Sequence, residues 1–105
     1  MKAIIRGKRY DTEKATLIGS ASSNLNVSDF GWWSEELYRT PRGGAYFLAG
    51  EGNARSHYAA NLGGGYWGSG EKIVPMSEAE AFAWAQEKLP AEDVEAAFSD
   101  MIADA

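Results

Sequence analysis

The chain has 105 residues, a length typical of one domain with a single hydrophobic core, and we predict one domain over residues 1–105. It contains no cysteine and a single histidine, His57, which excludes disulfide scaffolds, thiolate metal sites and sites built from several histidines. The formal net charge is −5, the wrong sign for a general nucleic-acid-binding protein. We therefore predict no direct nucleic-acid binding, no metal site and no cofactor.

No segment has the pattern of a membrane helix or a targeting signal. The longest uninterrupted apolar stretch, residues 45–49, is far shorter than the ~20 residues that a membrane-spanning helix needs. Only residues 3–5 are apolar behind Lys2, too few for the apolar region of a signal peptide. Both observations predict a protein of the cytosol that does not associate with membranes.

The first third of the chain is predicted to contain two strands and a loop. Residues 3–10 indicate an opening strand that a glycine bends or interrupts with a bulge. Asp11 stands directly before residues 12–14, in the position of a helix N-cap, and this pattern predicts one short helical turn. A second strand is predicted over residues 15–21, with continuation of the turn as the alternative. Residues 22–31 are rich in Ser, Asn, Asp and Gly and are predicted to be a loop.

The strongest β signal is a hairpin in the middle of the chain. Residues 35–40 alternate, so that Leu37 falls on one face and Tyr38 on the other. Residues 41–44 are Pro-Arg-Gly-Gly, which is turn chemistry, and residues 45–49 are rich in strand-forming side chains. Two strands joined by a short Pro/Gly loop are therefore expected to pair.

The glycine-rich stretch that follows is predicted to be a long loop. It covers residues 50–70 and includes one short helical turn around residues 55–61. Residues 71–76 are predicted to form the last strand, with Pro75 marking an edge or an end of it.

Two helices are predicted at the C-terminal end. Ser77 and Glu80 have the spacing of a capping box, and the helix that they begin should end near Lys88, before Pro90. Residues 91–103 are predicted to form a second helix. Its apolar stripe consists of Val94, Ala97, Phe98, Met101 and Ile102. The elements together predict an α+β fold, a small antiparallel β-sheet with two C-terminal α-helices packed on one face.

Two patterns resemble catalytic or phosphate-binding motifs but have the wrong spacing. Ser56 and His57 are adjacent, and neighbouring side chains diverge, so they are poorly placed to complete a hydrolytic triad with Glu51, and a small hydrolase that uses His57 is the least favoured interpretation. Residues 63–72 lack the Gly-Lys-Ser/Thr order of a phosphate loop, and a strand, not a helix, is predicted after them. We therefore predict that the protein is not an enzyme.

The many aromatic residues permit two main interpretations. Four of them, Trp32, Trp33, Tyr66 and Trp67, do not fall on regular periodic faces. They either cover the sheet and fill a small core, or form an aromatic patch that binds another protein, because Trp and Tyr dominate binding hot spots. Stacking on single-stranded nucleic acid is a third interpretation that the net charge disfavours. Adjacent residues of an extended segment point to opposite sides, so we expect one of Trp32 and Trp33 to be buried and the other more exposed.

The charge is distributed unevenly along the chain. Residues 1–74 carry nine Lys/Arg and seven Asp/Glu, whereas residues 75–105 carry one Lys and eight Asp/Glu. The acidic run is either a solvated helical face or a docking surface for a basic partner, because a field of one sign steers association. The positions that we assign to this surface are Glu78, Glu87, Glu92, Asp93, Glu95 and Asp100.

Four segments together resemble a family of short bacterial and mobile-element proteins. They are RYDTEKA (residues 9–15), WSEELYRT (residues 33–40), GAYFL (residues 44–48) and GEKIVP (residues 70–75). The resemblance covers residues 3–90, and within that family the alanine-rich acidic chain is most similar to type I-C anti-CRISPR proteins. None of the segments carries catalytic chemistry.

The resemblance implies a phage-encoded inhibitor that acts in the host cytoplasm. Such an inhibitor binds a subunit of a type I-C CRISPR surveillance complex and stops the complex from engaging target DNA. A surveillance complex presents channels lined with Lys and Arg, and an acidic surface can occupy such a channel in place of phosphates. The alternative is a small protein-interaction adaptor of a mobile element that uses the aromatic residues. Neither interpretation specifies the partner subunit or the oligomeric state.

Overall fold

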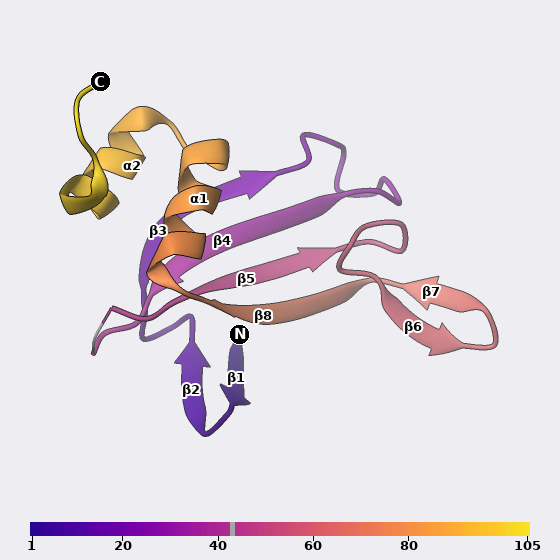
Figure 1. Ribbon diagram of the computed structural model, residues 1–105. Coiled ribbons are helices and arrows are strands. Elements are labelled where there is room, and N and C mark those ends of the chain that lie inside the picture. Colours follow the sequence, from indigo (N-terminus) through magenta and orange to yellow (C-terminus); the bar gives the residue numbers. More distant parts are fainter. Residues whose placement is uncertain (43) are drawn as a thin grey trace.

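The computed structural model describes residues 1–42 and 44–105, and at its centre lies a four-stranded antiparallel sheet (Figure 1). The strand order is β3-β4-β5-β8, formed by β3 (Thr16–Ser22), β4 (Trp33–Arg39), β5 (Tyr46–Gly52) and β8 (Gly70–Met76). Two hairpins stand outside this sheet: β1 (Lys2–Ile5) pairs with β2 (Lys8–Asp11), and β6 (Ala60–Gly63) pairs with β7 (Tyr66–Gly68). The chain ends in helices α1 (Glu78–Lys88) and α2 (Ala91–Phe98) and the 3₁₀ turn η1 (Ser99–Met101).

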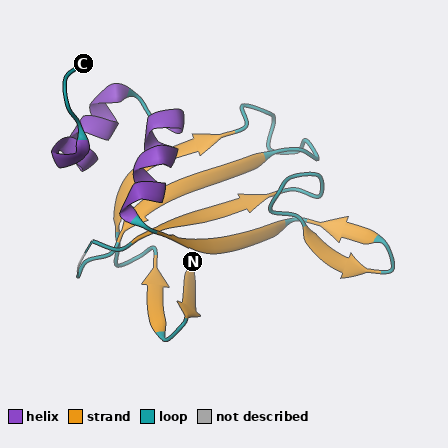
Figure 2. Ribbon diagram, in the orientation of Figure 1, coloured by secondary structure: helices purple, strands orange, loops and turns teal. Residues whose placement is uncertain are grey.

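The molecule has three layers, because both faces of the central sheet are covered (Figure 2). On one face, Leu37 and Leu48 pack against Trp84 of α1 and Phe98 of α2. On the other face, the apolar side chains of the sheet pack against the β1–β2 hairpin: Tyr38, Phe47, Ala49 and Ile73 contact Tyr10, Ala3 and Ile5. Successive side chains of a strand point to opposite faces, so strands β4 and β5 contribute to both cores.

The predicted α+β architecture is confirmed. The strand predicted over residues 15–21 is β3, the central hairpin is β4–β5, and the last predicted strand is β8, at an edge of the sheet. A hydrogen bond from Thr40 N to Ala45 O, 2.9 Å long, closes the central hairpin. Gly43 of the predicted turn lies outside the described residues.

The capping box of the first helix is also confirmed. Ser77 Oγ accepts a hydrogen bond from Glu80 N at 3.1 Å, and Glu80 Oε1 accepts one from Ser77 N at 3.0 Å. The two bonds satisfy backbone N–H groups that a helix start otherwise leaves unpaired. The helix ends at Lys88, two residues before Pro90, as predicted. Within the described part of the chain, no helix is long and apolar enough to cross a membrane.

Two β-hairpins replace elements that the sequence analysis predicted differently. Residues 3–10 are not one bent strand: Arg6 (φ 52°) and Gly7 (φ 77°) are both left-handed and form the two-residue turn between β1 and β2. Residues 55–61 contain turns and the start of β6 but no helix. The β6–β7 hairpin lies inside the predicted loop, and three successive glycines with positive φ shape its end: Gly63 is the last residue of β6, and Gly64 and Gly65 form the turn.

Two smaller predictions near the chain ends need correction. Residues 12–14 form a turn and no helix, because Asp11 accepts hydrogen bonds from Glu13 N through its side chain and from Lys14 N through its carbonyl oxygen. The second helix ends at Phe98, not at residue 103, and continues only as η1. The buried part of its apolar stripe is therefore shorter than predicted, and Ile102 is 41% exposed.

Candidate functional site

A carboxylate, Glu35 of β4, is buried between the central sheet and α1. The residue is only 7% exposed, and its side chain lies on the same face of the sheet as Leu37. Glu35 accepts hydrogen bonds from Tyr58 Oη at 2.5 Å and from Trp84 Nε1 at 3.0 Å. Its Oε2 atom also lies 3.2 Å from Nε2 of His57. We call Glu35, His57, Tyr58 and Trp84 the Glu35 cluster.

The loop between β5 and β6 places two members of the Glu35 cluster. Asn53 anchors this loop, because its Nδ2 atom donates hydrogen bonds to the carbonyl oxygens of Val27 at 2.8 Å and Asp29 at 2.7 Å. The Tyr58 side chain lies over Gly50 of β5 and so reaches Glu35 on the neighbouring strand β4. A Cβ atom at position 50 would overlap the tyrosine ring. Since Glu35 also contacts Trp84, the cluster joins β4, the β5–β6 loop and α1.

Hydrogen bonding keeps Glu35 ionised in spite of its burial. Burial alone would raise the pKa of Glu35, but hydrogen bonds from Tyr58, Trp84 and His57, together with the charge of protonated His57, lower it below the ordinary value. For Tyr58, burial raises the pKa, and the hydrogen bond to Glu35 and the negative charge of that carboxylate raise it further. Tyr58 is therefore a neutral donor at physiological pH.

The arrangement differs from a hydrolytic site. His57 contacts Glu35 and not Glu51, and the Ser56 hydroxyl donates to the carbonyl oxygen of Asn53 at 2.7 Å. The His57 side chain is 56% exposed, and its ring lies 4.3 Å from the Tyr58 ring. Within residues 1–42 and 44–105, no three or more His, Asp or Glu side chains are grouped so that they could hold a metal ion. Because Glu35 stays ionised and Tyr58 stays a neutral hydrogen-bond donor, the clearest consequence of the Glu35 cluster concerns stability.

We expect the stability of the protein to fall in acid partly through Glu35. Its pKa is lower in the folded protein than in the unfolded chain, where a glutamate titrates at about 4.3. Glu35 therefore stabilises the fold above about pH 4.3, and this contribution is lost as the pH falls through the lower, folded pKa. Urea unfolding at a series of pH values should give a shallower acid decline for Glu35→Gln than for the wild type. Parallel curves for the two proteins would contradict this assignment.

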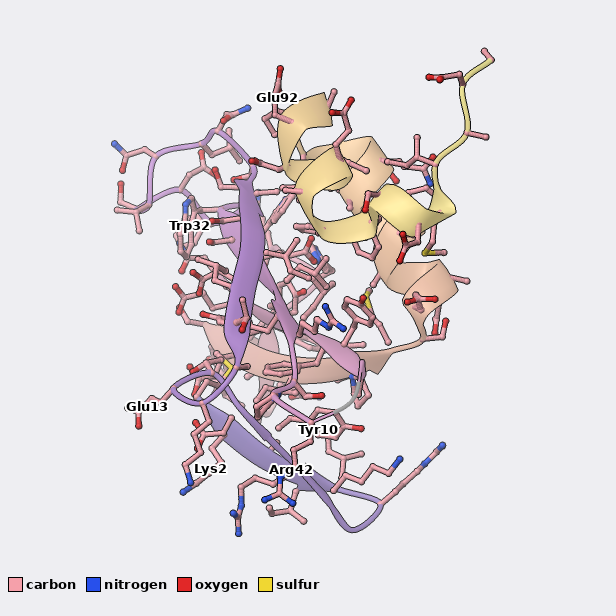
Figure 3. The ribbon with its side chains drawn as sticks, turned by 90° about the vertical axis from the view of Figure 1, so that its left-hand side faces the viewer. Lys2, Tyr10, Glu13, Trp32, Arg42 and Glu92 are labelled. Atoms are coloured by element: carbon pink, nitrogen blue, oxygen red, sulfur yellow. The ribbon has the colours of Figure 1, made fainter. Side chains whose placement is uncertain are left out.

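The predicted acidic residues are all exposed, but they do not form one compact patch. Glu87 lies beside Lys88 and Trp33 at one side of the helices, and Asp93 shares a surface hollow with Arg39. Glu95 lines a third hollow, near Met101 and the chain end. Figure 3 shows Glu92 at the end of the molecule opposite to Lys2 and Arg42. The carboxylates thus surround the helices on several sides.

The four predicted aromatic site residues separate into two locations. Trp32 and Trp33 are both partly exposed, so the expectation that one is buried is wrong. The Trp33 ring lies 5.1 Å from Lys88 Nζ and 5.5 Å from the His57 ring, which places it beside the Glu35 cluster. Tyr66 is 74% exposed and Trp67 is 55% exposed on the β6–β7 hairpin, which projects from one end of the sheet (Figure 1).

Other exposed apolar side chains are found at the same end of the sheet as the β6–β7 hairpin. They are Leu25, Val27 and Phe30 in the β3–β4 loop and Leu62 on β6. Antiparallel pairing brings this loop and the β5–β8 connection to one end of the sheet. Asn53 links the two segments, because it bonds Val27 and Asp29 and its Oδ1 atom accepts a hydrogen bond from Ser69 at 3.1 Å.

The sequence analysis missed the buried carboxylate and two of its donors, Tyr58 and Trp84. One signal was present, since Glu35 alternates with Leu37 and so falls on the apolar face of a predicted strand.

No protein-family model, no curated protein and no solved structure matches this chain. The structure thus defines a small α+β domain with acidic helices, an apolar end and a buried polar cluster.

Proposed function

We propose that the protein is a non-catalytic inhibitor of a type I CRISPR surveillance complex in the host cytoplasm. Its acidic helical layer, which comprises α1, α2 and η1, binds a basic surface of the complex and blocks target DNA engagement. The observation that carries the proposal is the exposure of the predicted carboxylates: Glu78, Glu87, Glu92, Asp93, Glu95 and Asp100. The one cation of residues 75–105, Lys88, lies 3.8 Å from Glu87 and over Trp33, so it offsets little of this charge.

The distribution of the carboxylates supports a channel as the partner surface. Glu87, Asp93 and Glu95 border three different hollows around the helices. A flat basic patch would meet only one of these sides, whereas a groove lined with Lys and Arg on more than one wall would meet several. Such grooves hold the guide–target duplex and the displaced strand in RNA-guided complexes. Four sequence segments resemble a family of short bacterial and mobile-element proteins, and the similarity of the alanine-rich acidic chain to the type I-C anti-CRISPR proteins within that family supports this choice of complex.

Reversing the charge of the helical layer is expected to abolish inhibition. A variant with Lys at all six positions should stay folded, because the side chains are exposed and Glu80 of the capping box is left unchanged. Single changes are expected to have small effects, since an exposed charge pair contributes only ~0.2–1 kcal/mol. The measurement is competition with target duplex for the purified surveillance complex.

A matched control separates the position of the charge from its amount. The triple variant Glu87→Lys/Glu92→Lys/Glu95→Lys should lose most of the inhibition. An equal charge change at exposed carboxylates outside the helices, Glu13→Lys/Glu51→Lys/Glu71→Lys, should retain it. Full inhibition by the six-residue variant would overturn the proposal.

The apolar end of the sheet favours a second candidate function, a protein-interaction adaptor. Tyr66, Trp67 and Leu62 are exposed on a hairpin that contributes no side chain to either core. Exposed aromatic residues are frequent anchors of protein interfaces. Salt separates the two candidates, because acidic docking weakens sharply as ionic strength rises, whereas binding through an apolar surface changes little. Loss of binding in Tyr66→Ala/Trp67→Ala, with no dependence on salt, would favour the adaptor.

A further inference from the structure

The β1–β2 hairpin, which covers the face of the central sheet opposite the helices, is basic. The exposed cations of residues 1–15 are Lys2, Arg6, Lys8, Arg9 and Lys14, against two carboxylates, Asp11 and Glu13. Figure 3 shows Lys2 and Arg42 at one end of the molecule and Glu92 at the other. The β1–β2 hairpin and the helices pack on opposite faces of the central sheet. The sheet therefore separates a basic layer from an acidic one.

A surface groove lies between the β1–β2 hairpin and residues 40–42. Its charged lining consists of Lys8, Arg9, Lys14 and Arg42, with Asp11 as the single carboxylate. The Asp11 side chain is already occupied by a hydrogen bond from Glu13 N at 3.0 Å. In the described part of the chain, the ion pairs are His57–Glu35 and Lys88–Glu87, so none of the four groove cations is paired. We call this hollow the basic groove.

The lining of the basic groove fits a phosphate polymer better than a protein. Protein interfaces are depleted in Lys, and although Arg is enriched in them, their hot spots also include large aromatic anchors such as Trp and Tyr. The aromatic rings at the floor of the groove, Tyr10 and Phe47, are 8% and 0% exposed and pack against each other with centroids 5.5 Å apart, so they provide no anchor. Buried rings cannot stack on unpaired bases either, which disfavours single strands. The affinity of a protein for a duplex backbone comes instead largely from the neutralisation of phosphates by Lys and Arg, which needs no exposed ring.

We propose that the basic groove binds the phosphate backbone of duplex DNA without reading its sequence. This inference does not rest on the proposed inhibitor function. It differs from our sequence-based prediction of no direct nucleic-acid binding, which relied on the net charge of the whole chain. Packed layers lie about 10 Å apart, so the helices are about 20 Å from the hairpin. That separation exceeds the Debye length of ~8 Å at physiological ionic strength, so the acidic layer does not prevent binding at the groove.

Fluorescence anisotropy with a labelled DNA duplex of mixed sequence tests the proposal. Neutralisation of four phosphates predicts a slope of about −3.6 for log K against log salt, which is roughly a 100-fold loss of affinity between about 50 and 200 mM salt. Arg9→Gln/Arg42→Gln should weaken binding about tenfold or more and make the slope shallower by about 2. The control, Arg55→Gln/Lys72→Gln, makes the same change of charge at exposed residues away from the groove and should bind like the wild type.

Three outcomes would overturn the proposal. The first is that the wild type does not bind the duplex at the lowest salt concentration. The second is that both double variants lose affinity equally. The third is that a single strand of the same length, or polyglutamate, binds more tightly than the duplex. Circular dichroism melts of both variants establish that any loss of binding occurs in folded protein. Since the assay contains no surveillance complex, its result is separate from the test of inhibition.

Discussion

We expect the Glu35→Ala variant to lose about 3–5 kcal/mol of unfolding free energy. The substitution leaves Tyr58 Oη and Trp84 Nε1 without their acceptor. Each buried donor that loses its partner costs ~1–3 kcal/mol, and the two losses act on the same part of the core. Urea unfolding followed by circular dichroism at neutral pH measures the effect.

Two further variants show whether the cost arises from burial and charge. Glu51→Ala removes the same side chain from an exposed site on the neighbouring strand β5 and should change stability by less than ~0.5 kcal/mol. Glu35→Gln retains an acceptor oxygen but not the negative charge, so we expect a loss between those of the two alanine variants. Equal stability of Glu35→Ala and Glu51→Ala would show that the hydrogen bonds of Glu35 do not stabilise the fold.

The Phe98→Ala variant is expected to be comparably unstable, for a different reason. Phe98 is 3% exposed, its ring stacks on Tyr46 with centroids 5.6 Å apart, and it also lies 5.4 Å from the ring of Phe82. Truncation of a fully buried phenylalanine costs about 3–5 kcal/mol, because apolar burial is lost and a cavity remains. Thermal and urea unfolding are the measurements.

Ile102→Ala is the matched control for this second variant. Ile102 belongs to the same predicted apolar stripe but is 41% exposed, beyond the end of η1. Its truncation should cost much less than that of Phe98. If the two variants unfold at the same urea concentration, α2 does not hold the sheet in the way that the structure indicates.

The parts of the fold that could be predicted are those with strong local signals. Alternation over residues 35–40 and the turn chemistry that follows identify the central hairpin, and the capping box at Ser77 marks the start of α1. The β6–β7 hairpin was missed, because its strands have only four and three residues and contribute no side chain to either core. Its three glycines resemble a loop in composition, although Gly63 ends β6 and the next two form one defined turn.

The candidate site was harder to predict, because its contacts are distant in sequence. Glu35 meets His57 and Tyr58 at separations of 22 and 23 residues, and Trp84 at 49. No spacing rule connects such positions, because the fold of the β5–β6 loop and the packing of α1 on the sheet bring them together. The acidic composition of the helices was evident from the chain, but their orientation on the sheet, and hence the spread of the carboxylates over several sides, was not.

The packing of the Tyr58 side chain over Gly50 restricts which amino-acid substitutions this chain can accept. A Cβ atom at position 50 would overlap the ring, and one at position 70 would overlap the Tyr58 carbonyl oxygen. Positions 50 and 58 are therefore expected to change together: a side chain at 50 requires a smaller residue at 58, which would no longer reach Glu35. Among distant descendants of this sequence, a glycine at 50 paired with a tyrosine at 58 would mark those that still keep a charged residue in the core.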